Sequence, residues 1–337
     1  MGACVEKGGT VMDILETEYG LQIKTLNETL WDNKAHKPKI DAWLNNFEDE
    51  TEKEYALFLL SKLMYFNDSN IRRLLQILYK DLFRYPIIED IRKKNNNTLN
   101  EQLIEESFIE RLNKTRFLAV GDPSESGGYL LYYFRQENKL MKQLFVNIDD
   151  VIANNKLNEK HNDLNFVFID DLCGSGMQAT SNGSNVKRCV EKIRCWASNA
   201  KVSYFVLFGM TDGLNNVRNS RLYDSVEAVI EIDESYRCFG ERSRFFELRD
   251  EEKKQKIKAM AERYGYKLAL DIAKREYWVK DKEAEANANK LGFRNCQLLL
   301  SMNHNTPNNT LPIIWYDEDN CNWTPIFKRY NKVYGKL

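Results

Sequence analysis

The fold is predicted from one stretch, Asn165-Phe-Val-Phe-Ile-Asp-Asp-Leu-Cys-Gly-Ser-Gly-Met-Gln-Ala-Thr180. It begins with a short apolar run, residues 166–169, which is rich in β-forming residues and too brief for a helix, so it predicts a buried strand. Two carboxylates, Asp170 and Asp171, follow where that strand should leave the sheet. A Gly174-Ser175-Gly176 turn comes next, and the sequence after it is compatible with a helix. This order of elements is typical of a phosphate-binding loop, in which backbone N–H groups and a helix N-terminus face the anion.

The acidic pair narrows the class of ligand. Carboxylates repel phosphate, so a loop that binds phosphate alone gains nothing from two of them at its edge. An ionised Asp only accepts hydrogen bonds, and a ribose offers two adjacent hydroxyl donors. The pair can also support Mg²⁺ through water. A sugar phosphate such as 5-phosphoribosyl pyrophosphate (PRPP) has all of these features. A strand that ends in a solvated acidic turn, with no ligand, is the alternative interpretation.

The stretch resembles the PRPP-binding signature of the type I phosphoribosyltransferases. In that resemblance Asp170 and Asp171 match the pair that holds the ribose hydroxyls. Leu172 and Cys173 match the spacer, and Ser175-Gly176 matches the turn that takes the 5-phosphate. The resemblance implies an enzyme that acts at C1 of ribose, with Mg²⁺ bound together with PRPP or a nucleotide.

Two positions depart from the signature. Gly174 stands where many members carry an Asp proposed as general base, and Gln178 replaces the final Thr of the motif. Ligand binding survives both departures. The usual proton transfer does not, so deprotonation of the acceptor must come from another group.

Composition gives the broad class. The chain has 337 residues, and a net charge of −1 argues against a dominant surface for binding polyanions. No apolar run approaches the length of a membrane-spanning helix, and the first residues lack a signal-peptide core. Seven scattered cysteines form neither a disulfide framework nor a zinc site, which favours reduced thiols in a cytoplasmic protein.

Residues 1–112 are predicted to be a helical region. Amphipathic patterns over 11–19, 25–31, 40–47, 52–66 and 71–85 favour short helices packed as a bundle, and Pro86 should end the last of them. We find no catalytic constellation there. Residues 113–337 are predicted to form an α/β domain with a C-terminal extension.

Strand and helix patterns alternate in that second region. Strands are predicted over 117–120, 144–152, 201–210 and 226–232, and helices over 129–138, 186–196 and 214–222. Such alternation implies a mostly parallel sheet, with ligands at the C-terminal strand ends. Gly121, Asp170 and Thr211 should therefore cluster.

A second glycine-rich turn, residues 121–128, precedes the acidic loop by one βαβ step. The resemblance assigns this turn to pyrophosphate, with Gly121, Asp122, Ser124 and Ser126 as contacts, although a plain surface turn explains it equally well. Residues 156–163 correspond to the flexible lid of the family, where Lys156, Lys160 and His161 are candidates for contacts; a solvated loop is the alternative.

Two later stretches carry polar side chains suited to recognition. In residues 236–246 aromatic residues alternate with arginines, which suits base stacking, a phosphate clamp or a loop over the sheet edge. Residues 298–315 run from an apolar strand into a turn rich in Asn. Asn305 and Asn308 are candidates for ligand contacts, and His304 is a candidate acid or base or a structural cap.

The whole pattern resembles the phosphoribosyltransferase-like proteins of bacterial conflict and anti-phage systems. The C-terminal element that carries this resemblance is Asn305-Thr306-Pro307-Asn308-Asn309-Thr310-Leu311-Pro312. The resemblance implies a type I phosphoribosyltransferase fold with an N-terminal helical region and a C-terminal hood-like element. It also implies a defence effector, with a partner such as a retron reverse transcriptase and its nucleic acid.

The candidate site combines these residues. The catalytic candidates are Asp170, Asp171 and His304, and the first two are also the candidate metal ligands. The ligand-binding candidates are Cys173, Gly174, Ser175, Gly176, Met177, Gln178, Gly121, Asp122, Ser124, Ser126, Asn305 and Asn308. Three functions stay open: an enzyme acting at ribose C1, a nucleotide-binding sensor without chemistry, and a structural partner in a defence complex.

Overall fold

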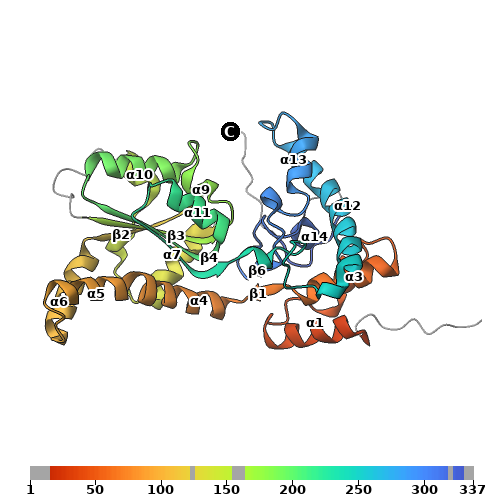
Figure 1. Cartoon of the computed structure of the whole chain (residues 1–337), viewed down its shortest axis with the longest axis horizontal. Coiled ribbons are helices and arrows are strands. Elements are labelled where there is room, and N and C mark those ends of the chain that lie inside the picture. Colours follow the sequence, from red (N-terminus) through yellow and green to blue (C-terminus); the bar gives the residue numbers. More distant parts are fainter. Residues whose placement is uncertain (1–15, 122–125, 154–163, 318–321, 330–337) are drawn as a thin grey trace, which may run out of the picture.

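The computed structural model describes residues 16–121, 126–153, 164–317 and 322–329. A parallel four-stranded sheet forms the middle of one of its two lobes (Figure 1). The strands are β2 (Thr115–Ala119), β3 (Asn165–Cys173), β4 (Lys201–Met210) and β5 (Ser225–Ile232), in the order β2-β3-β4-β5. Every neighbouring pair is parallel. The predicted α/β class with a parallel sheet is therefore confirmed.

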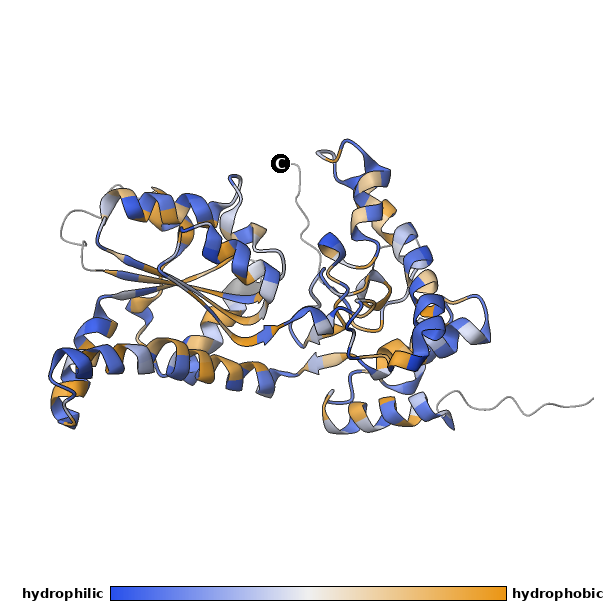
Figure 2. Ribbon diagram, in the orientation of Figure 1, coloured by the Kyte–Doolittle hydropathy of each residue, from blue (hydrophilic) through white to orange (hydrophobic). Residues whose placement is uncertain are grey.

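Both faces of this sheet are buried because the strands are apolar along most of their length. Val167 and Ile169 pack in one hydrophobic cluster, whereas Phe166 and Phe168 pack in another on the opposite face. Figure 2 shows the mostly apolar strands beside helices that mix polar and apolar residues. The alternation follows from the two-residue period of a strand.

Two sets of helices cover the two faces (Figure 1). The face of Val167 is covered by α4 (Asp68–Ile77), η2 (Leu78–Arg84), α5 (Tyr85–Lys94), α6 (Glu101–Asn113) and α7 (Ser126–Glu137). The face of Phe168 is covered by α8 (Ile148–Ala153), α9 (Met177–Thr180), α10 (Asn185–Trp196) and α11 (Thr211–Asn219).

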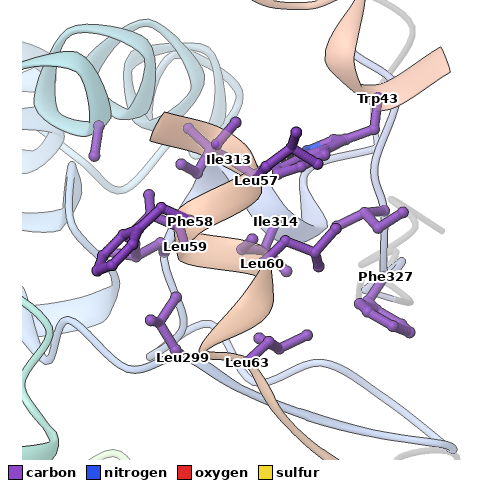
Figure 3. Packing of buried hydrophobic residues seen from close by; sticks show 14 of the residues in the cluster. Trp43, Leu57, Phe58, Leu59, Leu60, Leu63, Leu299, Ile313, Ile314 and Phe327 are labelled. Carbon is purple, nitrogen blue, oxygen red and sulfur yellow. Dashed lines mark hydrogen bonds between the residues drawn. The ribbon is translucent and has the colours of Figure 1, made fainter. Parts of the chain in front are cut away.

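A second lobe is built from both ends of the described chain. It contains α1 (Glu18–Thr29), α2 (Lys37–Leu44), α3 (Glu50–Ser61), α12 (Glu251–Arg275), α13 (Lys282–Asn289) and α14 (Pro312–Trp315). Figure 3 shows α3 residues such as Leu57 and Leu60 packed against Ile313 and Ile314. The indole N–H of Trp43 also donates to the Ile313 carbonyl at 2.8 Å.

A short parallel pair, β1 (Met64–Phe66) and β6 (Leu300–Met302), lies between the two lobes (Figure 1). Tyr65 packs in the cluster of the second lobe, while Met64 and Phe66 pack against the cluster on the sheet. Strand alternation therefore lets β1 join the two hydrophobic clusters.

The sequence pattern predicts that the helices before residue 113 pack as one bundle. This prediction is wrong. Helices α1–α3 pack with the C-terminal segment, and α4–α6 pack on the sheet. Where described, the helices predicted over 11–19 and 25–31 correspond to the single helix α1. The division of the chain at residue 112 stays a prediction. The hydrophobic cluster of the second lobe and the cluster on the Val167 face of the sheet each contain residues from both sides of that position.

The strand predicted over 144–152 is wrong. This segment forms a 3₁₀ turn, η3 (Lys142–Leu144), and helix α8, in which Ile148 and Val151 are buried. Their spacing of three residues is helical, and Asp149 and Asp150 favour the first turn of a helix, where the peptide dipole is positive.

The helix predicted to end at Pro86 instead continues. The π-helical segment η2 leads directly into α5, in which Pro86 occupies one of the first two positions. Proline is tolerated there because its missing N–H and its ring disturb an α-helix least in the first turn. The π-helical turn before it also replaces the i→i−4 hydrogen bonds that a proline would interrupt.

No helix in the described ranges is both long enough and apolar enough to cross a membrane.

Candidate functional site

The carboxyl ends of the parallel strands bring the predicted segments to one edge, as expected. The Val120 N–H donates to the Ile169 carbonyl at 2.9 Å, so Gly121 follows β2 beside the part of β3 that carries Asp170 and Asp171. Gly121 has a φ of +98°, a left-handed conformation that favours glycine. Thr211 begins α11 directly after β4.

The acidic pair lies within β3 and not after it. Because β3 runs to Cys173, Asp170 and Asp171 alternate across the sheet and their side chains leave on opposite faces. This differs from the predicted end of the strand before the pair. The predicted grip of both carboxylates on the ribose hydroxyls stays a prediction.

Asp170 faces the interior. It is 5% exposed, and its Oδ2 accepts a hydrogen bond from the Tyr204 hydroxyl at 2.7 Å. Its Oδ1 accepts the Asp171 N–H at 2.9 Å. Burial and then the neighbouring charge of Asp171 raise the pKa of Asp170 well above its usual value. The catalytic and metal-binding roles predicted for Asp170 stay predictions, and its contacts serve the sheet.

Asp171 pairs with His304, which lies 133 residues away in the sequence. Nε2 of His304 is 3.2 Å from Oδ2 of Asp171, while Oδ1 of Asp171 accepts the Leu172 N–H at 2.8 Å. The His304 side chain is 5% exposed, and its Nδ1 is buried without a hydrogen-bond partner in the described part of the chain. If the carboxylate holds a proton on Nε2, Nδ1 is left as an acceptor.

Tyr129 fixes the plane of this imidazole. Its ring stacks on His304 with centroids 5.1 Å apart and an angle of 26°. The Tyr129 hydroxyl donates to Asp68, which also accepts from Arg72 Nε at 3.0 Å. Burial would raise the pKa of Asp68, but the hydrogen bonds from Tyr129 and Arg72 outweigh it and lower that pKa. Asp68 is therefore an ionised anchor for the ring that holds His304.

Sequence reasoning missed Asp68 and Tyr129. Asp68 lies before the helix pattern of residues 71–85, Tyr129 lies within that of residues 129–138, and no local pattern links either residue to His304. The cap of α4 is Asn67, whose side chain accepts the Asn70 N–H.

The glycine turn is closely packed on both sides. A Cβ at Gly174 would lie 2.3 Å from Nδ2 of Asn309, and a Cβ at Gly176 would lie 2.7 Å from the Gly213 carbonyl oxygen. Gly176 also has a left-handed φ of +78°. The residue before the turn, Cys173, is buried, and burial raises the pKa of its thiol to about 12, so it is not a reactive thiolate.

The helix after the turn is a single turn. The Ser181 N–H already bonds the Met177 carbonyl, which ends α9 after four residues. Its dipole is correspondingly small, so backbone N–H groups must do most of any anion binding. The Ser175 N–H has no acceptor among the described residues, and the side chains of Met177 and Gln178 are exposed.

Asn309 is the asparagine of the C-terminal element that reaches the glycine turn. It is 7% exposed, and its Nδ2 donates to Sγ of Cys296 at 3.1 Å. Asn305 and Asn308 lie on the same element and are half-buried, and their predicted ligand contacts stay predictions. The local motif contained Asn309, but the sequence offered no reason to prefer it.

Several predicted residues cannot be placed. Asp122, Ser124, Lys156, Lys160 and His161 lie outside the described residues. Ser126 begins α7, and its side chain is not described.

The donor set does not fit a metal ion held by the protein alone. In the described ranges, no group of three or more His, Cys, Asp or Glu side chains could hold a metal. Asp170 is bonded inside the sheet and Asp171 is paired with His304, so the acidic pair is not a preformed cage.

A parallel α/β sheet with a glycine turn at its carboxyl edge is consistent with the fold of a phosphoribosyltransferase-like protein. The chain matches the PRTase-CE family over residues 40–329 and belongs to that family. The match begins in α2 and includes both lobes. No curated protein and no solved structure is significantly similar to the chain.

Proposed function

We propose that this protein binds PRPP or a related ribose-phosphate nucleotide at the carboxyl edge of the sheet and acts at C1 of the ribose. One observation carries the proposal: the C-terminal element that covers Gly174 with Asn309 also places His304 on Asp171. A phosphate-binding turn and a possible proton acceptor therefore share one edge.

The roles of the residues follow from their positions. The Gly174–Gly176 turn takes the 5-phosphate with its backbone N–H groups. Asp171 lies on the ligand side of β3, and its Oδ2 is hydrogen-bonded to Nε2 of His304. It therefore orients the imidazole and sets its tautomer.

His304 supplies the proton acceptor that Gly174 cannot. In the proposed transfer, pyrophosphate leaves with the electron pair of its bond to C1, and a nitrogen of the acceptor or a water oxygen bonds to C1. The proton of that nucleophile passes to Nδ1 of His304, the imidazole nitrogen without a partner in the described part of the chain. Positioning and charge stabilisation supply the rest of the rate.

Magnesium enters this proposal as part of the substrate. The diphosphate of PRPP is a set of hard oxygen ligands that suits Mg²⁺, and the acidic pair of the protein does not form a cage for it.

A nucleotide-binding sensor without chemistry is the second candidate function. Asp170 faces Tyr204 and not the ligand side, and Gly174 lacks the acid that many phosphoribosyltransferases carry there. Either function fits an anti-phage effector with a partner such as a retron reverse transcriptase and its nucleic acid. The resemblance of residues 305–312 supports that setting.

The proposal is tested by measuring both ligand binding and product release. Calorimetry with PRPP and Mg²⁺ measures binding, and release of pyrophosphate or free base from a nucleotide panel measures reaction. We expect His304→Gln to retain binding and to lower release by about 100-fold or more. The matched control is His36→Asn, a substitution at the exposed cap of α2 that keeps a capping side chain.

The outcomes separate the candidates. Binding with release that depends on His304 supports the enzyme. Binding without release supports the sensor. Absence of binding to PRPP and to every nucleotide in the panel contradicts both.

A further inference from the structure

The backbone carbonyls of residues 175–179, in and after the glycine turn, all accept hydrogen bonds from the protein. Their donors, in the order of the acceptors, are Asn216 Nδ2, the Thr180 hydroxyl, the Ser181 N–H, the Ser184 hydroxyl and the Tyr223 hydroxyl. Most of these donors are side chains. Asn216 and Tyr223 lie 41 and 44 residues away from their acceptors in the sequence. The acceptors of this segment are therefore used inside the protein.

The N–H groups of the same segment are used less completely. Those of Ser175 and Gln178 have no acceptor among the residues that the structure describes. Backbone polar groups are nearly always paired, with protein, water or a ligand. A segment with bonded carbonyls and spare N–H groups offers only donors, which suits an anion and agrees with the phosphate-binding role proposed for the turn.

The bonded carbonyls also fix where the N–H groups point. A trans peptide is planar, and its C=O and N–H point in opposite directions. The hydrogen bond from Asn216 to the Ser175 carbonyl, at 3.2 Å, therefore sets the direction of the Gly176 N–H. The same holds for each later peptide of the segment. The direction of the donors thus depends on residues outside the turn.

Tyr223 holds the other end of the segment. It lies in the loop between α11 and β5 and is 8% exposed, and its ring centroid lies 5.5 Å from that of Tyr204. Its hydroxyl donates to the Ala179 carbonyl at 2.9 Å. The Ala179 N–H in turn donates to the Gly176 carbonyl at 3.2 Å. One fully buried residue, Ala179, therefore connects Tyr223 to the glycine turn.

The protonation state of Tyr223 suits this contact. Burial, and then the charge of Asp170, raise the pKa of Tyr223, so its hydroxyl stays a donor at neutral pH. Tyr204 holds the strand on the other side of the turn, because its hydroxyl donates to Asp170 at 2.7 Å. The two packed tyrosines thus hold the chain before and after the turn.

We infer that Tyr223 and Asn216 are positioning residues for the 5-phosphate. Tyr223 acts through Ala179. Asn216 acts through the Ser175 carbonyl, and both hold the Gly174–Gly176 turn in the conformation that binds the phosphate. This inference rests on the proposed function and names the groups that prepare its phosphate site. Donors that are held in place before the ligand arrives bind it more tightly, because less conformational freedom is lost on binding.

The first test is calorimetry on the full chain with ribose 5-phosphate as the probe. Tyr223→Phe keeps the ring and loses only the hydroxyl, so it should weaken ribose 5-phosphate binding by about 3- to 10-fold. Asn216→Ala changes an exposed side chain and should weaken binding by about 2- to 5-fold. Its control is Asn215→Ala, because Asn215 is also exposed on α11 and accepts from Arg218 at 3.3 Å. The control should bind like the wild type.

Thr115→Val is the matched control for Tyr223→Phe. Thr115 is fully buried, and its hydroxyl donates to a backbone carbonyl, that of Arg111, at 2.9 Å. It begins β2, at the edge of the sheet opposite the glycine turn. Both substitutions remove one hydroxyl and should lower the unfolding temperature by about 1–4 °C. Only Tyr223→Phe should weaken ligand binding, so the comparison separates positioning from a loss of stability.

Hydrogen exchange gives a readout that needs no ligand. In Tyr223→Phe, the amides of residues 175–181 should exchange about 3-fold faster or more than in the wild type, because local opening of the segment becomes easier. Thr115→Val should leave the exchange of these amides unchanged. The measurement is made on the free protein by mass spectrometry of the peptide that contains the turn.

The outcomes distinguish this inference from the proposed function. Weaker binding in Tyr223→Phe and in Asn216→Ala, with faster exchange in Tyr223→Phe, supports it. If the wild type binds ribose 5-phosphate and either variant binds it equally well, this inference alone is overturned. Unchanged exchange in Tyr223→Phe, or an equal loss of affinity in Thr115→Val, also overturns it.

The remaining outcomes concern the ligand and the folding of the variant. If the wild type binds neither ribose 5-phosphate nor PRPP, the proposed function fails and this inference fails with it. If Tyr223→Phe does not fold, the comparison of Asn216→Ala with Asn215→Ala decides the question.

Discussion

At the scale of single residues, Asn309 explains why the motif has glycine at position 174. A Cβ at Gly174 would lie 2.3 Å from Nδ2 of Asn309, which is itself bonded to Cys296. We expect Gly174→Ala to lower the free energy of unfolding by about 1–3 kcal/mol, because the buried Asn309 must move. Urea unfolding measures this change. An acid at position 174 meets the same obstacle.

A matched glycine supplies the control for that substitution. Nothing lies within 4 Å of a Cβ at Gly183, so Gly183→Ala should change the free energy of unfolding by no more than about 0.5 kcal/mol. Adding Asn309→Ala to Gly174→Ala should recover part of the loss. Equal effects of the two glycine substitutions would contradict the steric explanation.

Also at the residue scale, the buried Asp170 makes the free energy of unfolding depend on pH. Its pKa is raised in the folded chain, so folding binds a proton and the free energy of unfolding falls as pH rises above the unfolded value of about 3.9. Asp170→Asn lacks this effect, and its stability relative to the wild type should grow between pH 4 and pH 8. Each unit of difference between folded and unfolded pKa corresponds to about 1.4 kcal/mol.

Urea unfolding at several pH values measures the dependence on Asp170. The exposed Gln143 supplies the control, since Gln143→Ala changes no titratable group and should show a nearly constant difference from the wild type. A constant difference for Asp170→Asn as well would show that this carboxyl is not buried as described.

At the scale of elements, Arg72 holds α4 to α7, the helix that carries Tyr129. Its guanidinium contacts Asp68 at 3.0 Å and Glu137 at 2.9 Å, and it lies 3.7 Å from the ring centroid of Tyr133. The Arg72 side chain is one-third exposed, so Arg72→Ala should cost about 1 kcal/mol and not several. It should also lower any turnover that depends on His304, because Tyr129 loses its fixed support.

Chemical denaturation and the pyrophosphate-release assay measure those two effects. The neighbouring Arg73 is exposed, and Arg73→Ala should leave both quantities close to the wild-type values. If Arg72→Ala behaves like Arg73→Ala in both assays, the link from α4 through Tyr129 to His304 does not operate.

At the scale of the whole molecule, the site is divided between two lobes. The sheet supplies Asp171 and the glycine turn, and the segments that pack with α1–α3 supply His304 and Asn309. Leu60 on α3 is fully buried in that second lobe (Figure 3). Leu60→Ala should lower the free energy of unfolding by about 2–5 kcal/mol, and it should weaken ligand binding although it touches no ligand.

Leu21 offers the comparison for Leu60, because it is 55% exposed on α1 of the same lobe. Leu21→Ala should change the free energy of unfolding by no more than about 0.5 kcal/mol. Denaturant titration and calorimetry on both variants make the measurement. Weak binding in both variants, or in neither, would argue against a site that depends on the packing of the second lobe.

The parts of the fold that could be predicted are those that depend on residues close together in the sequence. Residues 201–210 form β4 as predicted, and the glycine turn follows β3, because strand and turn signals are local. The segment around α8 was wrongly predicted as a strand, because a short apolar run with charges fits both the two-residue period of a strand and the 3.6-residue period of a helix. The bundle was misread because amphipathic helices show which face is buried and not what covers it.

The sequence by itself determined the parallel α/β sheet and the place of the glycine turn along the chain. Only the tertiary structure decided that Asp170 turns inward to Tyr204 while Asp171 meets His304, and that Asn309 covers the turn. The physical reason is that the face on which a side chain leaves a strand depends on the register and extent of that strand. Contacts between residues more than a hundred positions apart depend on how both lobes pack.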